Sequence, residues 1–337
     1  MTLPAPTLTL VADVGGTNTR VALARGLSVD GASVRRYANA EHPDIGAVLR
    51  RFLLDEGGPR PAAACVAAAG PVREGRVTMT NIDHWPPIEK AALAEATGAG
   101  VVAILNDLQA QGQALGHIAP ARLRAVIARP EANPHAAKLV IGVGTGFNAA
   151  AVYDTEGGRL VTPSESGHVN LPIRTAADAR LAAWLAENRG FPSVEEVLSG
   201  RGLANVYSWL FDEDGRPEPR LGATGRITSA EVMERLEAGE LRALRAARAF
   251  ARMLGTVAGN LALIQLPYGG IWLAGGMARA VAPWLSELGF EEAFHDKGRF
   301  APLLAEFGVG VIEDDDAALT GSAAHLLGLL RRGHSPT

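Results

Sequence analysis

This chain of 337 residues has only one cysteine, no long apolar run and no excess of positive charge. Its single cysteine, Cys65, excludes an intramolecular disulfide framework and a multi-cysteine zinc site. Because Cys65 lies in the apolar run 62–69, we expect it to be a buried core residue. No apolar run approaches the roughly 20 residues that span a bilayer, and the N-terminus lacks the pattern of a secretory signal. We therefore expect a cytoplasmic protein without membrane contact.

The charge balance is mildly acidic. The chain has 32 Lys and Arg against 36 Asp and Glu, a formal net charge of −4. This balance provides no basic surface for nucleic acid, so no nucleic-acid partner is expected. The apolar content of 47% is ordinary for a packed globular protein, and the length is sufficient for two lobes.

Short β-favouring segments alternate with segments of helical pattern, which indicates an α/β fold. Residues 7–13 and 20–24 flank a glycine turn and predict a hairpin. Further strands are predicted at 61–69, 99–105 and 270–274, and helices at 45–55, 88–97, 240–266 and 317–332. The capping-box patterns Ser193-x-x-Glu196 and Thr228-x-x-Glu231 predict two more helix starts.

An internal repeat relates the two halves of the chain. Residues 10–24 (LVADVGGTNTRVALA) align without gaps, at an offset of 129, with residues 139–153 (LVIGVGTGFNAAAVY). Each segment passes from a strand through a Gly/Thr turn into another strand, so duplication explains the pair better than chance does. Two related lobes that face each other predict a cleft between them, where ligands commonly bind.

The first glycine turn has the composition of a phosphate loop. Gly15 and Gly16 allow backbone amides to approach a phosphate closely, and Thr17 and Asn18 add side-chain donors. Asp13, which precedes them, is suited to hold Mg²⁺ directly or through water. An ordinary hairpin turn is the alternative. The turn is not a G-x-G-x-x-G motif followed by a helix, and no G-x-x-x-x-G-K-[ST] motif occurs, which argues against Rossmann and P-loop enzymes.

The second glycine turn comprises Gly144, Thr145 and Gly146. Gly142 stands where the first segment has Asp13. One loop then carries an acidic group and the other contributes only hydrogen-bond donors. This asymmetry suits one bound nucleotide better than two equivalent sites.

Asn106 and Asp107 directly follow a predicted strand. A carboxylate at the carboxyl end of a strand commonly projects into a cleft. Within reach of a sugar hydroxyl, Asp107 can accept the proton as the oxygen attacks phosphorus. The alternative is a helix N-cap, a position that both residue types favour.

A fourth group of polar residues comprises Glu165, Ser166 and His168, followed by Glu195 at a predicted helix start. Two carboxylates and an imidazole can bind the hydroxyls of a polyol and discriminate between isomers. The alternatives are a glutamate favoured by the helix dipole, for Glu195, and a structural histidine, for His168.

Taken in order, these motifs resemble the bacterial glucokinase family of the hexokinase/actin-like superfamily, over nearly the whole chain. The matching segments are Asp13-Val14-Gly15-Gly16-Thr17-Asn18 with Arg20, Met79-Thr80-Asn81 with Trp85, Asn106-Asp107, Gly144-Thr145-Gly146, the E-x-V-L-S-G pattern at 195–200, Leu273-Ala274-Gly275-Gly276, and residues 296–300. Each motif alone is weak, and seven in the correct order are strong.

The resemblance implies a two-lobed ribonuclease-H-like fold of the actin/hexokinase type, with a cleft between a small domain (1–117 and 317–337) and a large domain (118–316). It implies ATP-dependent phosphorylation of glucose to glucose 6-phosphate by a homodimer, with Asp107 as the catalytic base that deprotonates the 6-hydroxyl. The implied sugar ligands are Asn81, Asn106, Asp107, Glu165, His168 and Glu195. The implied positions for Mg-ATP are Asp13 (Mg²⁺), Gly15, Gly16, Thr17, Asn18, Gly144, Thr145, Gly146, Gly275 and Gly276.

Two segments depart from the family pattern, at three residues. Where the family usually reads E-G-G-H, this chain has Ser166, and where it often reads G-T-G-L-G, this chain has Phe147 and Asn148. Ser166 adds a side chain beside the expected sugar ligands. Both departures leave Asp107 intact, so they bear on substrate identity and rate, and a related hexose is an alternative substrate.

Two other functional classes fit the sequence less well than a kinase. Sugar-responsive repressors of related fold carry a helix-turn-helix before the first phosphate motif, and here only about a dozen residues precede Asp13. One cysteine cannot supply the zinc motif of repressor-like kinases. A sugar sensor or degenerate kinase gains no support from the retained Asp13 and Asp107. An actin-like assembly protein leaves Glu165, His168 and Glu195 unexplained.

Overall fold

The computed structural model describes residues 7–79, 82–128, 133–215 and 227–333. The chain forms two compact units: unit 1 is Met1–Pro120, Asp154–Pro163 and Asp314–Thr337, and unit 2 is Ala121–Tyr153 and Ser164–Glu313. The sequence-based division assigned residues 154–163 to the larger part, whereas in the structure they pack with unit 1. The reason is that side chains of α3 (Asp107–Ala114) bond this segment, as Gln109 Nε2 donates to the Val161 carbonyl at 3.2 Å.

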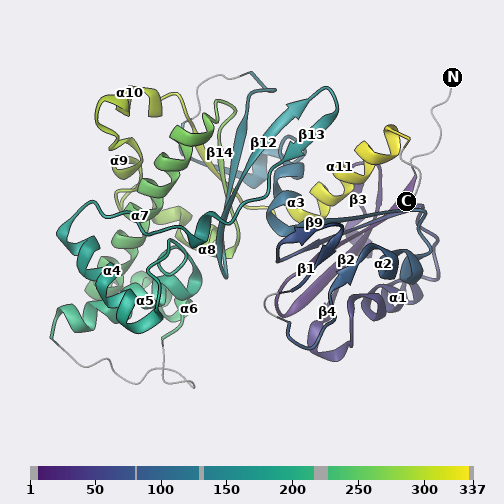
Figure 1. Ribbon diagram of the computed structural model, residues 1–337, viewed down its shortest axis with the longest axis horizontal. Helices are drawn as coiled ribbons and strands as arrows, with labels where there is room; N and C mark the ends of the chain where they lie inside the picture. Colours follow the sequence, from purple (N-terminus) through teal and green to yellow (C-terminus); the bar gives the residue numbers. More distant parts are fainter. Residues whose placement is uncertain (1–6, 80–81, 129–132, 216–226, 334–337) are drawn as a thin grey trace. The chain divides into compact units, whose positions relative to one another are not determined.

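The sheet of unit 1 is built around β1 (Leu8–Val14). It runs antiparallel to β2 (Asn18–Arg25) and parallel to β5 (Ala63–Ala68), which pairs in parallel with β9 (Val101–Asn106) (Figure 1). The short strands β3 (Ser28–Val29) and β4 (Arg35–Ala38) pair with β2. Because β1 and β9 point the same way, Asp13 and Asn106 lie at the same edge of the sheet.

Helices cover both faces of this sheet, and alternate strand residues point to opposite faces. Leu10 and Ala12 pack with α1 (Ile45–Asp55) and α2 (Lys90–Thr97). Val11 and Cys65 pack with α3 and α11 (Ala317–Arg331). The prediction that Cys65 is a core residue is confirmed, and burial raises the pKa of its thiol to about 12.

One predicted helix start in unit 1 is wrong. Ile88 and Glu89 form β8, the last strand of a small sheet with β6 (Val72–Arg73) and β7 (Arg76–Val77), and α2 begins only at Lys90. Ile88 is buried as the strand partner of Val77. The apolar pattern at this point therefore reflects the sheet rather than a helix face.

Unit 2 repeats the strand arrangement of unit 1. Its central strand β11 (Lys138–Val143) is antiparallel to β12 (Phe147–Thr155) and parallel to β14 (Ile271–Ala274), which pairs in parallel with β15 (Val309–Ile312). The edge strand β10 (Leu123–Ile127) pairs with β15. The order β12-β11-β14-β15 matches β2-β1-β5-β9 in position and direction, as the internal repeat predicted.

The two hairpins differ in the length of their turns. Val14 pairs with Thr19 in unit 1, whereas Val143 pairs with Phe147 in unit 2, so the second turn is one residue shorter. The ungapped alignment is therefore one residue out of register after the turn. In consequence, Asn148 in unit 2 takes the position across the hairpin that Arg20 takes in unit 1.

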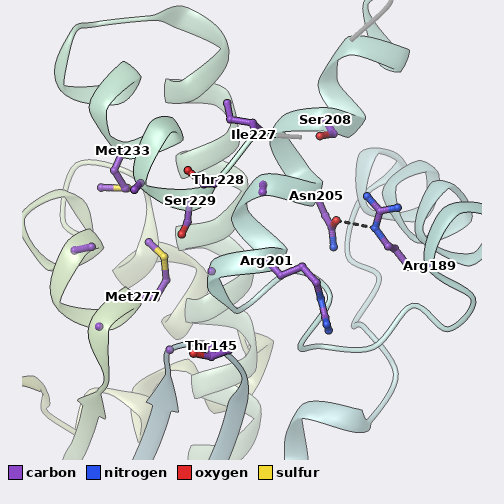
Figure 2. A pocket seen from close by; sticks show the side chains of 16 residues that line it. Thr145, Arg189, Arg201, Asn205, Ser208, Ile227, Thr228, Ser229, Met233 and Met277 are labelled. Atoms are coloured by element: carbon purple, nitrogen blue, oxygen red, sulfur yellow. Dashed lines mark hydrogen bonds between the residues drawn. The ribbon is translucent and has the colours of Figure 1, made fainter. Parts of the chain in front are cut away.

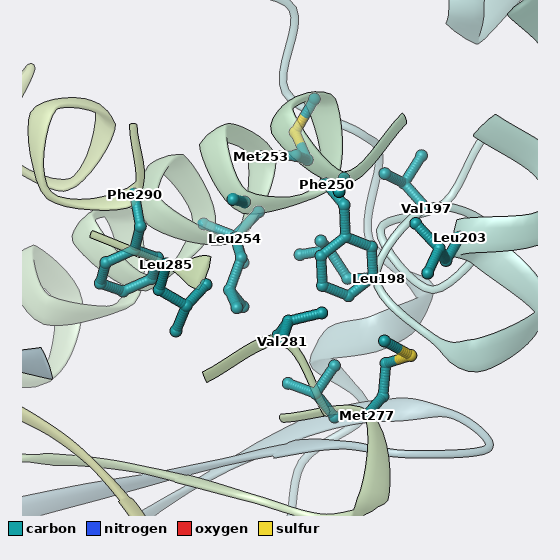
Figure 3. Packing of buried hydrophobic residues seen from close by; sticks show 14 of the residues in the cluster. Val197, Leu198, Leu203, Phe250, Met253, Leu254, Met277, Val281, Leu285 and Phe290 are labelled. Carbon is teal, nitrogen blue, oxygen red and sulfur yellow. The ribbon is translucent and has the colours of Figure 1, made fainter. Parts of the chain in front are cut away.

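The helices of unit 2 pack around one large apolar core. They are α4 (Ala176–Arg189), α5 (Gly200–Glu213), α6 (Ser229–Glu237), α7 (Leu241–Gln265), α8 (Gly276–Val281), α9 (Phe290–His295) and α10 (Ala301–Leu304). Figure 3 shows Phe250 and Leu254 of α7 between Leu198 and Phe290. Within the described residues, no helix has both the length and the apolar character to span a membrane.

The two predicted capping boxes have different outcomes. Thr228 caps α6 with Glu231 as its reciprocal partner, as expected. The box at Ser193 is wrong, because α5 begins at Gly200 with Ser199 as its N-cap. The carboxylate of Glu196 instead bonds Arg201 at 2.7 Å and Asn205 at 3.0 Å. Residues 195–197 form a turn, so Glu195 does not start a helix.

The contact between α3 and α11 generates a stability prediction. A Cβ on Gly321 would collide with the carbonyl of Ala110 and lie 2.9 Å from the amide nitrogen of Ala114. We expect Gly321→Ala to lower the free energy of unfolding by about 1–3 kcal/mol or more in urea denaturation. Gly328→Ala is the matched control on the same helix, because its Cβ meets Arg332 at an ordinary 3.6 Å. The control should be neutral or stabilising by up to about 1 kcal/mol. Equal free energies of unfolding for Gly321→Ala and Gly328→Ala would contradict the close packing of α11 on α3.

Candidate active site

The glycine turn of unit 1 is held by a buried asparagine from another segment. Gly15 N–H donates to the Asn18 carbonyl at 3.0 Å, which closes the turn. Asn39 donates from Nδ2 to the Gly15 carbonyl and accepts from Thr19 Oγ1, both at 2.8 Å, while its own N–H donates to the Thr17 carbonyl. Gly16 and Thr17 remain exposed at the tip. No sequence motif identified Asn39, because its role depends on a contact between distant segments.

Asp13 lies next to this turn and forms an ion pair across the hairpin. Its Oδ2 is 2.6 Å from Arg20 Nη2, and Arg20 also reaches Asp316 at 3.5 Å. Burial has the largest influence on the pKa of Arg20 and lowers it, but the charges of Asp13, Asp316 and Asp315 together outweigh burial and raise the pKa. Arg20 is therefore cationic at physiological pH, and it keeps a positive charge beside Asp13.

The structure gives Asn106 the role of a helix cap, which was the alternative interpretation of this pair. Asn106 Oδ1 accepts from Gln109 N–H at 2.6 Å, and Gln109 Oε1 accepts from Asn106 N–H at 3.0 Å. Asp107 is the first residue of α3 and is exposed, with Oδ1 accepting from Leu108 N–H at 2.9 Å. A carboxylate in the first turn of a helix is favoured by the helix dipole. Asn81 lies outside the described residues.

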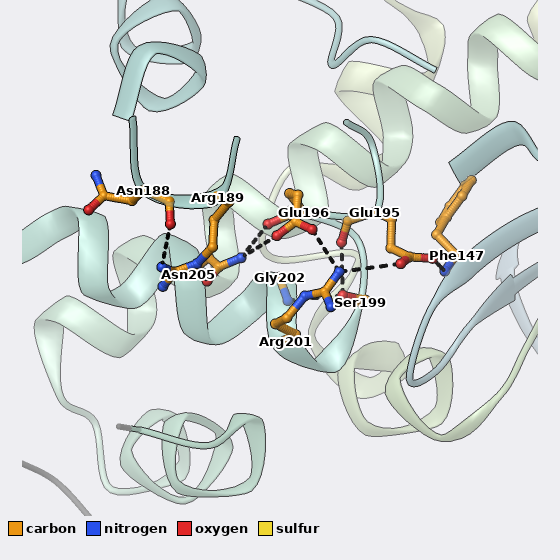
Figure 4. Close-up of polar contacts among 9 residues, drawn as sticks. All are labelled: Phe147, Asn188, Arg189, Glu195, Glu196, Ser199, Arg201, Gly202 and Asn205. Atoms are coloured by element: carbon orange, nitrogen blue, oxygen red, sulfur yellow. Dashed lines mark hydrogen bonds and ion pairs between the residues drawn. The ribbon is translucent and has the colours of Figure 1, made fainter. Parts of the chain in front are cut away.

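In unit 2, the carboxylate of Glu195 joins the second glycine turn to α5 (Figure 4). Its Oε2 accepts from Phe147 N–H at 2.9 Å, and its Oε1 is 3.3 Å from Arg201 Nη2. A Cβ at position 146 would lie 2.6 Å from Glu195 Oε2, so the approach requires Gly146. Glu195 is thus fixed against the glycine turn, although its position in a turn rather than a helix was not predicted.

A short 3₁₀ turn over Ser166–His168 lies beside the same hairpin, with Glu165 as its N-cap and His168 as its last residue. Both side chains are exposed. Between them, Gly167 is buried so tightly that a Cβ would collide with the Phe147 carbonyl, and its own carbonyl accepts from Glu195 N–H at 2.9 Å. The structure therefore brings Glu165, His168 and Glu195 to one side of the turn that contains Gly146.

A cavity of about 870 Å³ opens beside the second glycine turn (Figure 2). It is lined by Gly144 and Thr145, by Gly276 and Met277 of α8, and by residues of α4, α5 and α6 that include Arg189, Arg201, Asn205, Ser208, Thr228, Ser229 and Met233. Gly200 N–H donates to the Gly144 carbonyl at 2.8 Å, so α5 and the turn form one wall. The size and the mixed apolar and polar lining suit an organic ligand.

Gly275 shows why glycine is required where β14 ends, one residue before Gly276 of the cavity lining. Its φ of 103° is unfavourable for any residue with a side chain, and a Cβ would lie 2.6 Å from the Val143 carbonyl. Since β14 and β11 are parallel neighbours, Gly275 and Gly144 end adjacent strands at the same edge. The structure thus brings these two predicted glycine segments together, while the helical residues of the cavity were missed because they carry no motif.

Carboxylate, imidazole and thiol side chains are dispersed in the part of the chain that the structure describes. Among the described residues, no group of three or more His, Cys, Asp or Glu side chains could hold a metal ion. Mg²⁺ in phosphoryl-transfer sites usually takes one or two carboxylates plus phosphate oxygens and waters. The partly buried carboxylate of Asp13, with one oxygen bound to Arg20, fits this limited role and not that of a complete protein cage.

Comparison with known proteins gives consistent matches. A family model described as Glucokinase matches residues 10–328. A protein named Glucokinase from Chromohalobacter salexigens is 32% identical over 328 residues, covering 97% of this chain and 98% of that protein. Another, from Citrobacter koseri, is 33% identical, with 94% and 96% covered. The crystal structure of glucokinase from an Antarctic psychrotroph matches with a TM-score of 0.81 at 28% identity, over 95% of this chain and 98% of that one. This likeness confirms the expected actin/hexokinase-type α/β fold.

The bridging position of Glu195 generates a second stability prediction. Glu195→Ala leaves the Phe147 N–H, which is partly buried, without its acceptor, so we expect a loss of about 1–3 kcal/mol in urea denaturation. Arg201→Ala is the control, because it removes the partner of the other carboxylate oxygen. Arg201 has a side chain that is 57% exposed, and its loss should cost less than about 1 kcal/mol. If both variants lose the same free energy of unfolding, the contact of Glu195 with Phe147 contributes no more to stability than its contact with Arg201.

Proposed function

The chain belongs to the glucokinase family, and from that premise we propose that it transfers the γ-phosphoryl group of ATP to the 6-hydroxyl of glucose, with Asp107 as the general base. The observation that carries this proposal is the cavity of about 870 Å³ beside Gly144 and Thr145. It adjoins a glycine turn that is bonded directly to Glu195, a candidate sugar ligand.

The nucleotide is assigned to this cavity because the cavity offers two kinds of surface. Met233 and Met277 provide apolar contact for a planar base, while Ser208 and Ser229 provide polar groups for a ribose. The exposed Thr145 at the glycine turn would face the phosphates, whose charge the backbone amides can stabilise. The turn of Gly15, Gly16, Thr17 and Asn18 is assigned to phosphate binding in the same way. Gly146, Gly275 and Gly276 allow close approach of the backbone.

Asp13 is the residue that we propose to hold Mg²⁺, through one carboxylate oxygen or a bound water. Mg²⁺ supplies neutralisation of the charge on the transferring phosphoryl group. Arg20 holds Asp13 in place by the 2.6 Å contact and adds positive charge beside it. The exposed tip of the glycine turn, at Gly16 and Thr17, leaves room for phosphate oxygens.

The sugar ligands proposed are Glu165, His168 and Glu195 in unit 2, with Asn106, Asp107 and Asn81 in unit 1. A polyol needs acceptors and donors for each hydroxyl, and these residue types provide both. Asp107, in the first turn of α3, accepts the proton of the attacking hydroxyl. We also propose that the enzyme acts in the cytoplasm as a homodimer, which rests on the family resemblance.

The role of Asp107 generates a kinetic prediction. Asp107→Asn removes the base but keeps the shape of the side chain, so we expect turnover to fall roughly 10²–10⁴-fold while glucose affinity changes little. The measurement is ADP formation with Mg-ATP and glucose, mannose, fructose, galactose or glucosamine, together with calorimetric glucose binding. Asp30→Asn is the control: it is an exposed N-cap of the same unit, where Asn is equally suitable.

Three outcomes of this experiment would redirect the proposal. Near wild-type turnover in Asp107→Asn would remove Asp107 as the base. A wild-type protein that binds glucose and ATP but forms no ADP with any hexose would favour a sugar sensor instead. Preference for another hexose would keep the kinase and change the substrate.

The cavity assignment generates a separate prediction. Ala280 lines the cavity and is exposed to it, so Ala280→Trp should fill part of the space. We expect the KM for ATP to rise roughly tenfold or more, with calorimetric glucose binding within about twofold of wild type. Ala186→Trp, on an exposed position of α4 outside the cavity lining, is the matched control. An unchanged KM for ATP in Ala280→Trp would place the nucleotide elsewhere.

A further inference from the structure

Two of the three residues at which this chain departs from the family pattern, Asn148 and Ser166, are bonded to each other. Asn148 Oδ1 accepts from Ser166 N–H at 3.0 Å and from Ala149 N–H at 2.8 Å. Asn148 Nδ2 donates to the Ser164 carbonyl. Ser164 Oγ lies 2.7 Å from Ser166 Oγ and 2.5 Å from the Ala149 carbonyl. Three side chains thus connect β12 to the segment that contains Glu165.

Each hydroxyl has only one proton, which limits the direction of these bonds. Ser164 Oγ and Ser166 Oγ also lie 2.9 and 3.3 Å from Asn148 Oδ1. Ser164 donates to the Ala149 carbonyl, its shortest contact. The Ser166 proton then goes either to Ser164 Oγ or to Asn148 Oδ1. In both arrangements the Ser166 proton is used within the network.

This network anchors the segment to a rigid element. Asn148 lies in β12 and pairs with Gly142 of β11 in the centre of the unit 2 sheet. Ser166 immediately follows Glu165 and lies two residues before His168. Because the side chains of Glu165 and His168 are exposed, their positions depend mainly on where the backbone is held.

We propose that Asn148 is a positioning residue that orders the Glu165–Ser166–Gly167–His168 segment for the sugar before the sugar binds. This inference rests on the proposed function, because it assigns the sugar to Glu165 and His168. Ser166 then acts by tightening the turn and does not donate a hydrogen bond to the substrate. Pre-ordering a binding segment strengthens binding because the entropy of ordering it is not lost on association.

The test is a graded series of variants assayed for KM and kcat. Asn148→Asp keeps the oxygen for both N–H donors but turns a second oxygen toward the Ser164 carbonyl. We expect it to raise the KM for glucose roughly tenfold, which corresponds to the loss of about one net hydrogen bond. The KM for ATP should stay within about twofold of the wild-type value. Ser166→Ala keeps its N–H bond to Asn148 and should raise the KM less.

Asn188→Asp is the matched control for Asn148→Asp. Asn188 is exposed on α4, and its Nδ2 also donates to a backbone carbonyl, that of Trp184, at 2.9 Å. The same chemical change there should leave both KM values unchanged. Hydrogen exchange supplies a measurement that does not depend on activity: the Ser166 amide should exchange faster in Asn148→Ala, which lacks the acceptor, than in Asn148→Asp, which keeps it.

The outcomes separate this inference from the proposed function. A selective rise in the KM for glucose, with accelerated exchange at Ser166 in Asn148→Ala, supports the positioning role. If wild type phosphorylates glucose and Asn148→Asp has an unchanged KM, the inference is overturned and the function stands. Equal rises in both KM values would also overturn it, because they indicate a general structural defect. Wild-type protein that phosphorylates no hexose would overturn both.

Discussion

The contact between the Glu195 carboxylate and the Phe147 amide is the interaction on which the arrangement of unit 2 depends. It joins a turn that precedes α5 to a glycine turn that leads into β12. The close approach is possible only because Gly146 and Gly167 have no side chains at this point. One carboxylate therefore sets the spacing between a candidate sugar segment and the edge of the cavity.

The two hairpins show how one duplicated scaffold has acquired two kinds of chemistry. In unit 1, Asp13 faces Arg20 across the hairpin and forms an ion pair. In unit 2, the equivalent positions are Gly142 and Asn148, and Asn148 turns instead to Ser164 and Ser166. The same pair of backbone positions provides charge in one unit and a neutral hydrogen-bond network in the other. Divergence at two residues per hairpin is sufficient for this difference.

The sequence predicted those features that depend on local pattern. The strands, the two glycine hairpins and the Thr228 cap follow from residue spacing and turn chemistry, and the structure has them. It did not predict Asn39 or the cavity wall at Asn205 and Ser208, because these depend on segments that meet only in the folded chain. The error at Ser193 has the same origin: Glu196 fits a capping box locally, but Arg201 and Asn205 offer its carboxylate better partners.

The packing of α11 on α3 has a consequence for biosynthesis. Unit 1 is discontinuous, and α11 follows unit 2 along the chain. While the chain is still being translated, the sheet face that contains Val11 and Cys65 therefore lacks one of its two covering helices until unit 2 has been made. Domains usually fold as units during synthesis. The helix that begins with Asp107 thus gains its contacts with α11 only after unit 2 has been made.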